Sequence, residues 1–132
     1  MSNKQISKKD ILGTWKCVSY LVIREGKTND WTEATTGHLI YSEPGYMAAV
    51  LNHDHKQIRP GDKVPDRTTL CYAGPFEVSA EGVITHHVKN CSDSSWIGRA
   101  LERFPSWNEK GNLVLKAEGG MGTGIITWER IS

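Results

Sequence analysis

Two short segments at opposite ends of the chain place the tightest limit on its fold. Gly13 and Trp15 open the first run of residues that can form a strand, and Arg130 lies in the last such run, two residues before the C-terminus. In a closed antiparallel barrel the first and last strands are neighbours, so a tryptophan entering the first and an arginine leaving the last can stack. The sequence therefore predicts that Trp15 and Arg130 form the closed floor of a barrel.

The runs between these ends have the length and turn spacing of strands. Glycine occurs 13 times and proline five times, and only residues 4–12 approach the apolar spacing of a helix. We expect one helical turn there, with Ser7 as its candidate cap. Alternation and turn signals predict eight strands, at residues 13–24, 37–42, 46–51, 70–79, 83–89, 96–104, 113–118 and 125–131. In the first strand, alternation places Trp15, Cys17, Ser19, Leu21 and Ile23 on the inward face. An eight-stranded barrel has room for one small ligand or fills itself with side chains.

Four connections between the predicted strands are long or rich in glycine. Residues 25–30 and 105–112 are predicted to be turns. Residues 52–69 form the longest polar segment. A segment of that length without an apolar period is typical of a functional lid, a short surface helix or disorder, and we favour a lid over the open barrel mouth. The glycine-rich run at 119–124 has neither the lysine nor the following helix of a phosphate-binding loop, so we interpret it as a flexible hairpin end or a bulged strand.

Composition excludes several classes of protein. The length of 132 residues suits one domain, residues 1–132, and the formal net charge of +1 provides no basic surface for nucleic acid or an anionic membrane. The first ten residues are polar and contain three lysines, so they do not resemble a signal peptide. We therefore expect a soluble cytoplasmic protein. Three cysteines without C-x-x-C spacing predict small apolar fillers, Cys17 among them, and neither a disulfide nor a cysteine zinc site.

An ordered set of short motifs resembles the small lipocalin-like domain family, over about residues 10–131. The motifs are Gly13-Thr14-Trp15-Lys16 with Val18-Ser19-Tyr20, Gly37-His38-Leu39-Ile40-Tyr41, Gly45-Tyr46-Met47, Tyr72-Ala73-Gly74-x-Phe76, His86-His87-Val88, Gly98 with Arg103, and Trp128-x-Arg130. The chain departs from the family's pattern at Phe76, where a tyrosine is expected, and in residues 91–96, which lack a proline before the glycine. Both departures touch the rim of the pocket. The resemblance implies an all-β, eight-stranded antiparallel lipocalin-like barrel with a short N-terminal helical turn, but no single function.

His86 is the residue best suited to chemistry. Alternation places it on the same face as Ile84, with His87 on the opposite, more polar face. A histidine buried in a barrel can donate, accept or transfer a proton near neutral pH. Alternatively, His86 only fixes the core through a hydrogen bond to a tyrosine. Tyr72 is predicted to face inward on the preceding strand, where its hydroxyl needs a partner, and Tyr41 is another candidate partner.

The strand at 96–104 leaves the direction of its charged side chains open. Its alternate side chains form two sets, neither of them purely apolar: Arg99, Leu101 and Arg103, and Ala100, Glu102 and Phe104. If Arg103 points inward, the cavity holds a cation suited to a carboxylate or enolate. If Glu102 points inward, it could orient His86. The resemblance favours Arg103, whose position matches the family's arginine, and a surface salt bridge is the alternative for either residue.

We expect neither a metal nor a cofactor. His53 with His55, and His86 with His87, are the only histidine clusters, and a metal site needs three groups that converge from different strands. In a polar loop, His53 and His55 are expected to be solvated.

Two functions share one predicted pocket. The first is non-covalent binding of a small hydrophobic or polyketide-like metabolite by a monomer or homodimer. The residues expected to line the pocket are Tyr41, Met47, Phe76, Ile84 and Trp96. The second is a cofactor-independent cyclase, isomerase or hydratase of secondary metabolism, in which His86 moves a proton with help from Tyr72 or Arg103. A third, weaker hypothesis is a filled barrel that binds a partner protein.

Overall fold

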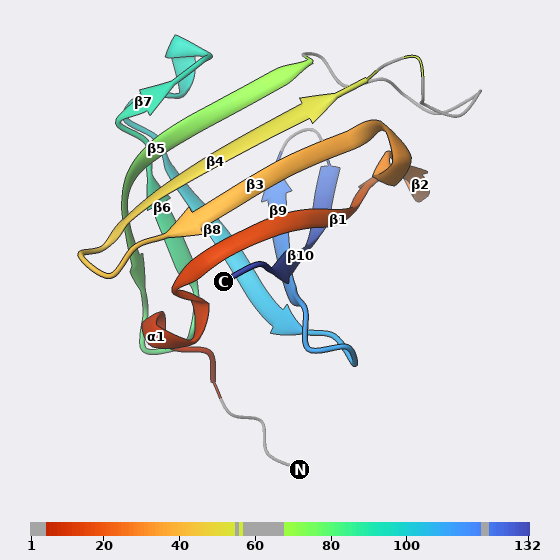
Figure 1. The fold of residues 1–132 in the computed structure, drawn as a ribbon. Helices are drawn as coiled ribbons and strands as arrows, with labels where there is room; N and C mark the ends of the chain where they lie inside the picture. Colours follow the sequence, from red (N-terminus) through yellow and green to blue (C-terminus); the bar gives the residue numbers. More distant parts are fainter. Residues whose placement is uncertain (1–4, 55, 57–67, 120–121) are drawn as a thin grey trace.

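The computed structural model in Figure 1 describes residues 5–54, 56, 68–119 and 122–132 and shows a barrel of antiparallel strands. In chain order, the elements within these residues are α1 (Lys8–Ile11), β1 (Gly13–Arg24), β2 (Lys27–Asp30), the 3-10 turn η1 (Thr32–Ala34), β3 (Thr35–Tyr41), β4 (Tyr46–His53), β5 (Thr69–Val78), β6 (Ile84–His87), β7 (Asn90–Cys91), the 3-10 turn η3 (Ser94–Trp96), β8 (Ala100–Trp107), β9 (Leu113–Gly119) and β10 (Gly122–Arg130).

Eight of these strands close the barrel. Their order is β10-β9-β8-β6-β5-β4-β3-β1, and β1 pairs again with β10, so that the first and last strands of the closed sheet are neighbours. β2 folds back on β1, and β7 adds to β5. The predicted all-β, eight-stranded antiparallel barrel with a short N-terminal helical turn is confirmed.

The closed end of the barrel is built around Trp15 and Arg130. The Arg130 guanidinium lies 4.2 Å from the centre of the Trp15 ring. Its Nη1 and Nη2 donate to the carbonyl oxygens of Leu12, at 2.6 Å, and Asp10, at 2.8 Å. The indole N–H of Trp15 donates to the carbonyl of Ile11 at 2.9 Å. The predicted stacking thus also holds the C-terminal end of α1, where helix carbonyls lack partners within the helix.

β1 changes the face that it turns inward at Val18. Its register on β10 passes from Cys17 opposite Trp128 to Ser19 opposite Thr127, which leaves Val18 as a bulge. The prediction that the inward face continues from Trp15 through Ser19, Leu21 and Ile23 is wrong beyond Cys17. Tyr20 packs against the core instead.

Most strand boundaries differ from the sequence-based prediction by a few residues, and the largest differences concern β2 and β8. Residues 27–30 form β2, and only Glu25 and Gly26, both with positive φ, make the turn before it. β8 begins at Ala100, because residues 94–96 form η3, and it continues through Pro105 to Trp107. Pro105 is tolerated because β6 begins at Ile84, opposite Arg103, so the β6 side of β8 is an edge at the proline.

Two predicted connections fall partly outside the described residues. In the predicted lid at 52–69, residues 52 and 53 belong to β4 and residue 69 to β5, while 55 and 57–67 are not described. Gly119 pairs with Gly122 across the β9–β10 hairpin, and residues 120–121 are not described.

The core lies inside the barrel and includes Ile11 of α1. Its most buried side chains come from α1 and from most strands of the barrel: Ile11, Trp15, Leu39, Tyr41, Ile84, Val88, Leu113 and Trp128, together with His86. Within the described ranges, no helix has the length and apolar character needed to cross a membrane.

Candidate functional site

His86 lies between two tyrosine hydroxyls inside the barrel. The Tyr41 hydroxyl lies 2.6 Å from Nε2 of His86, and the Tyr72 hydroxyl lies 2.8 Å from Nδ1. Tyr41 and His86 are each 1% exposed and Tyr72 is 7% exposed. One residue from each of β3, β5 and β6 therefore meets the others in a buried polar row.

A close approach between β5 and β6 brings Tyr72 and His86 together. Phe76 of β5 pairs with His86 of β6. At Gly74, between Tyr72 and Phe76, a Cβ atom would overlap the carbonyl oxygen of His87. Because Gly74 has no side chain, β5 can approach the chain at His87 closely enough for Tyr72 to reach His86.

Burial keeps all three members of the row uncharged near neutral pH. Burial, with smaller effects from the positive charge of Arg103 and from the neighbouring His87, lowers the pKa of His86 from 6.5 to about 3. Burial also raises the pKa of Tyr41 and that of Tyr72. At Tyr72 the positive charge of Arg103 acts in the opposite direction and lowers the pKa. His86 is therefore a neutral imidazole whose two nitrogens both have partners.

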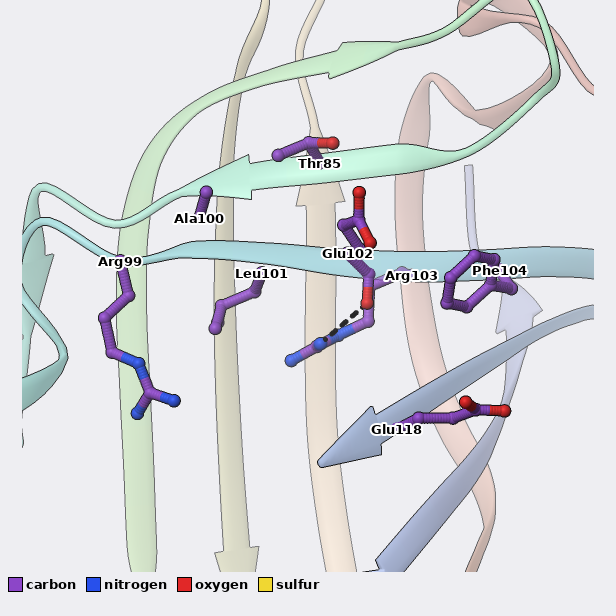
Figure 2. A pocket seen from close by; sticks show the side chains of 8 residues that line it. All are labelled: Thr85, Arg99, Ala100, Leu101, Glu102, Arg103, Phe104 and Glu118. Carbon is purple, nitrogen blue, oxygen red and sulfur yellow. Dashed lines mark hydrogen bonds between the residues drawn. The ribbon is translucent and has the colours of Figure 1, made fainter. Parts of the chain in front are cut away.

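A pocket of about 450 Å³ lies along β8, and the charge of Arg103, one of its lining residues, acts on this row. Figure 2 shows the eight residues that line it: Thr85, Arg99, Ala100, Leu101, Glu102, Arg103, Phe104 and Glu118. Arg99, Leu101 and Arg103 project to one side of β8 in this view. Leu101 belongs to the buried core, so this side faces the barrel interior. Arg103, and not Glu102, points inward.

The pocket opens where β8 and β9 separate. The two strands pair from Phe104 to Trp107, whereas the preceding residues of β8 pair with β6 alone. The carbonyl of Glu102 accepts a hydrogen bond from Nη1 of Arg103 at 3.0 Å. The arginine side chain is thus held against its own strand where it lines the pocket.

The other residues predicted to line the pocket lie deeper or at the barrel's edge. Met47, Phe76 and Ile84 are buried in the core, and the Phe76 ring lies 4.7 Å from that of Tyr41. Trp96 lies in η3, where its ring is 6.1 Å from Tyr72 and 5.2 Å from the Arg99 guanidinium. Of the predicted site residues, Arg103 alone is among the eight that line the described pocket.

Sequence reasoning did not select Arg99, Leu101 and Glu118 as site residues. Arg99 and Leu101 share the alternation of Arg103, so an inward Arg103 implies that they face the same side. Glu118 carried no signal, because it reaches the pocket only where β9 diverges from β8.

His53 is not solvated as expected. It ends β4, is 8% exposed, and its Nδ1 lies 2.8 Å from the Thr35 hydroxyl. Its ring packs edge-on against Tyr20 and Trp31, whose rings stack on each other. His55 is outside the described residues. In the part of the chain with described coordinates, no three His, Cys, Asp or Glu side chains gather closely enough to hold a metal ion.

Comparisons with known proteins concern the family and the fold of the chain. A family model described as a lipocalin-like domain matches residues 12–131. A redesigned beta barrel has a TM-score of 0.51 at 10% identity, over 99% of this chain and 100% of that one. A mutant of the fluorescent protein UnaG has a TM-score of 0.45 at 14% identity, over 93% of this chain and 97% of its own. At such low identity the redesigned barrel shows similarity of fold alone. No curated protein matches the chain.

Proposed function

The chain belongs to the lipocalin-like domain family, and from this premise we propose that its barrel binds one small hydrophobic, polyketide-like molecule that carries an acidic oxygen. The observation that carries the proposal is the pocket of about 450 Å³ along β8, with its inward-facing arginine. Sites for small molecules typically measure about 300–1,000 Å³ and combine apolar walls with a few polar groups.

Arg103 supplies the polar part of the recognition. A guanidinium has five N–H donors and no acceptor, and it pairs well with carboxylate, phenolate or enolate oxygens. Leu101 and Phe104 provide apolar surface beside it, and Arg99 adds a second positive charge. Because Glu102 and Glu118 also border the pocket, we expect the ligand to carry few negative charges beyond the group at Arg103.

Calorimetric titration with 1,8-dihydroxyanthraquinone tests this function, because the compound is aromatic, polyketide-like and acidic. We expect it to bind more tightly than its dimethyl ether. Ala100→Trp narrows the pocket from its exposed rim and should weaken binding at least about tenfold, which is ~1.4 kcal/mol. Ala80→Trp adds the same side chain in the turn between β5 and β6 and should leave affinity unchanged. Equal binding by both tryptophan variants would place the ligand elsewhere and refute the proposal.

The buried row of Tyr41, His86 and Tyr72 favours a second candidate, a cofactor-independent cyclase, isomerase or hydratase that uses the same pocket. Because the pKa of His86 is about 3, it would act by passing a proton between its two tyrosines rather than by holding one at neutral pH. His86→Ala tests this candidate on any metabolite that the protein transforms. Lost turnover with retained binding identifies an enzyme, whereas weakened binding without any turnover in either protein identifies a carrier.

Several expectations stay predictions. They are the monomeric or homodimeric state, a cytoplasmic location and the lack of a nucleic-acid partner.

A further inference from the structure

We propose that Tyr72 and Arg103 form a pair of hydrogen-bond donors that holds one oxygen atom of the bound molecule, and that His86 and Tyr41 are positioning residues that orient the Tyr72 hydroxyl. The inference rests on the proposed binding function and narrows its ligands to phenols, enols and enolisable ketones. It follows from counting the protons in the buried row.

A neutral imidazole carries one N–H, so His86 donates to one tyrosine and accepts from the other. Tyr41 is 1% exposed, and within the described residues its hydroxyl bonds to His86 alone. If His86 donated to Tyr41, the hydroxyl hydrogen of Tyr41 would be buried without an acceptor, which is unfavourable. Tyr41 therefore donates to Nε2, and the imidazole proton resides on Nδ1.

With its proton on Nδ1, His86 donates to the oxygen of Tyr72, which lies 2.8 Å away. The positive charge of Arg103 also acts on this hydroxyl. Because the oxygen of Tyr72 accepts from His86, the hydroxyl hydrogen of Tyr72 needs an acceptor of its own. A ligand oxygen beside Arg103 supplies one.

Arg103 is placed to donate to the same oxygen. One of its N–H groups bonds to the Glu102 carbonyl, and the side chain lines the pocket. Arg103 pairs with Ile84, so it lies on the inward face diagonally next to His86. Two fixed donors aimed at one oxygen favour the form in which that oxygen carries negative charge, as in an oxyanion hole. A ligand without such an oxygen would leave buried donors unpaired and would bind more weakly.

The tautomer of His86 is the first test, and it needs no ligand. Nitrogen-15 NMR of histidine-labelled protein distinguishes a protonated ring nitrogen from an unprotonated one. We expect the proton of His86 on Nδ1, with the signal assigned by its loss in His86→Gln. A proton on Nε2 would mean that Tyr72 donates to His86, and would overturn the inference while leaving the binding function intact.

The second test measures stabilisation of an oxyanion with 4-nitrophenol, whose anion absorbs at a longer wavelength than the neutral phenol. We expect the wild-type protein to bind the anion more tightly than 4-nitroanisole and to lower the pKa of the bound phenol. Tyr72→Phe should weaken binding of the anion about tenfold and raise that pKa again, and Arg103→Met should do so more strongly. Tyr46→Phe, an equivalent change at an exposed position of β4, should change neither.

The outcomes separate the two proposals. Tighter binding of the nitroanisole than of the phenolate, or a Tyr72→Phe variant that binds the anion as well as wild type, would refute the donor pair alone. Binding of neither compound would refute the donor pair and the proposed binding function together. Thermal unfolding of each variant checks that a loss of binding does not reflect a loss of the fold.

Discussion

At the scale of single residues, the surroundings of His86 determine what it can do. A solvated histidine titrates near neutral pH, whereas this one is buried, bonded at both nitrogens and close to the Arg103 charge. Each of these features favours the neutral ring. His86 is therefore better suited to fixing the direction of two hydroxyls than to acting as a free base.

The pH dependence of stability should reveal this buried histidine. The pKa of His86 falls from 6.5 to about 3 on folding, so between these values the unfolded chain binds more protons than the folded one. The free energy of unfolding should thus rise with pH by up to about 1.4 kcal/mol per pH unit in this window. The stability that comes from the neutral His86 should be lost progressively as the pH falls below 6.5. Urea unfolding between about pH 5 and 6.5 measures the slope, above the range in which most carboxylates titrate.

His86→Gln provides the control for this slope, because glutamine can hydrogen-bond but does not titrate. The variant should be less stable at neutral pH. Its free energy of unfolding should depend less steeply on pH, because about one proton fewer is taken up on unfolding. Identical slopes in both proteins would show that His86 titrates normally in the folded state.

At the scale of elements, the close approach of β5 and β6 at Gly74 holds the site in place. Gly74→Ala would force a methyl group against the His87 carbonyl and push the two strands apart. We expect a loss of about 1–3 kcal/mol in the free energy of unfolding, the usual cost of overpacking. The Tyr72–His86 hydrogen bond should also lengthen, which the His86 nitrogen-15 shifts would detect. Ala73→Gly, at the adjacent residue, controls for changes in backbone flexibility.

The elements also show what sequence can and cannot predict. The bounds of β1 were predicted correctly, because the alternation of side chains and the turn residues that follow it indicate the same end of the strand. The inward face of β1 beyond Cys17 was wrong, because a bulge at Val18 depends on the register with β10 and leaves no local signal. Proline suggested a turn at 105, yet β8 continues through it along an unpaired edge.

The candidate site was predictable to a similar extent. The alternation of side chains along the strands predicted that His86 and Tyr72 lie inside the barrel, and the family resemblance favoured an inward Arg103. That Tyr41 and Tyr72 bond to the two nitrogens of one ring depends on the close approach of β5 and β6, which no local pattern specifies. The gap between β8 and β9 is likewise a property of strand pairing, and this is why Glu118 was missed.

At the scale of the whole molecule, the seam between β1 and β10 decides whether the sheet is closed. It joins strands from the two ends of the chain, with Trp15 opposite Arg130. Gly13 lies beside this seam with φ near 130°, and a Cβ atom there would lie 2.8 Å from Nη1 of Arg130. Gly13 therefore leaves room for Arg130, which stacks on Trp15 and hydrogen-bonds to the end of α1, so the three residues together connect the seam to the helix.

Arg130→Gln tests how much this connection contributes to the stability of the barrel. The variant loses the charge over the Trp15 ring and the two hydrogen bonds to carbonyls at the end of α1. Charge-assisted hydrogen bonds and an exposed cation–π contact suggest a loss of about 2 kcal/mol in the free energy of unfolding, measured in urea. Lys16→Gln, which breaks the exposed Lys16–Glu129 pair across the same seam, should cost less than about 0.5 kcal/mol. If both variants were equally stable, the hydrogen-bonded ladder alone would hold the barrel closed, and the arginine would serve only to fix α1 beneath it.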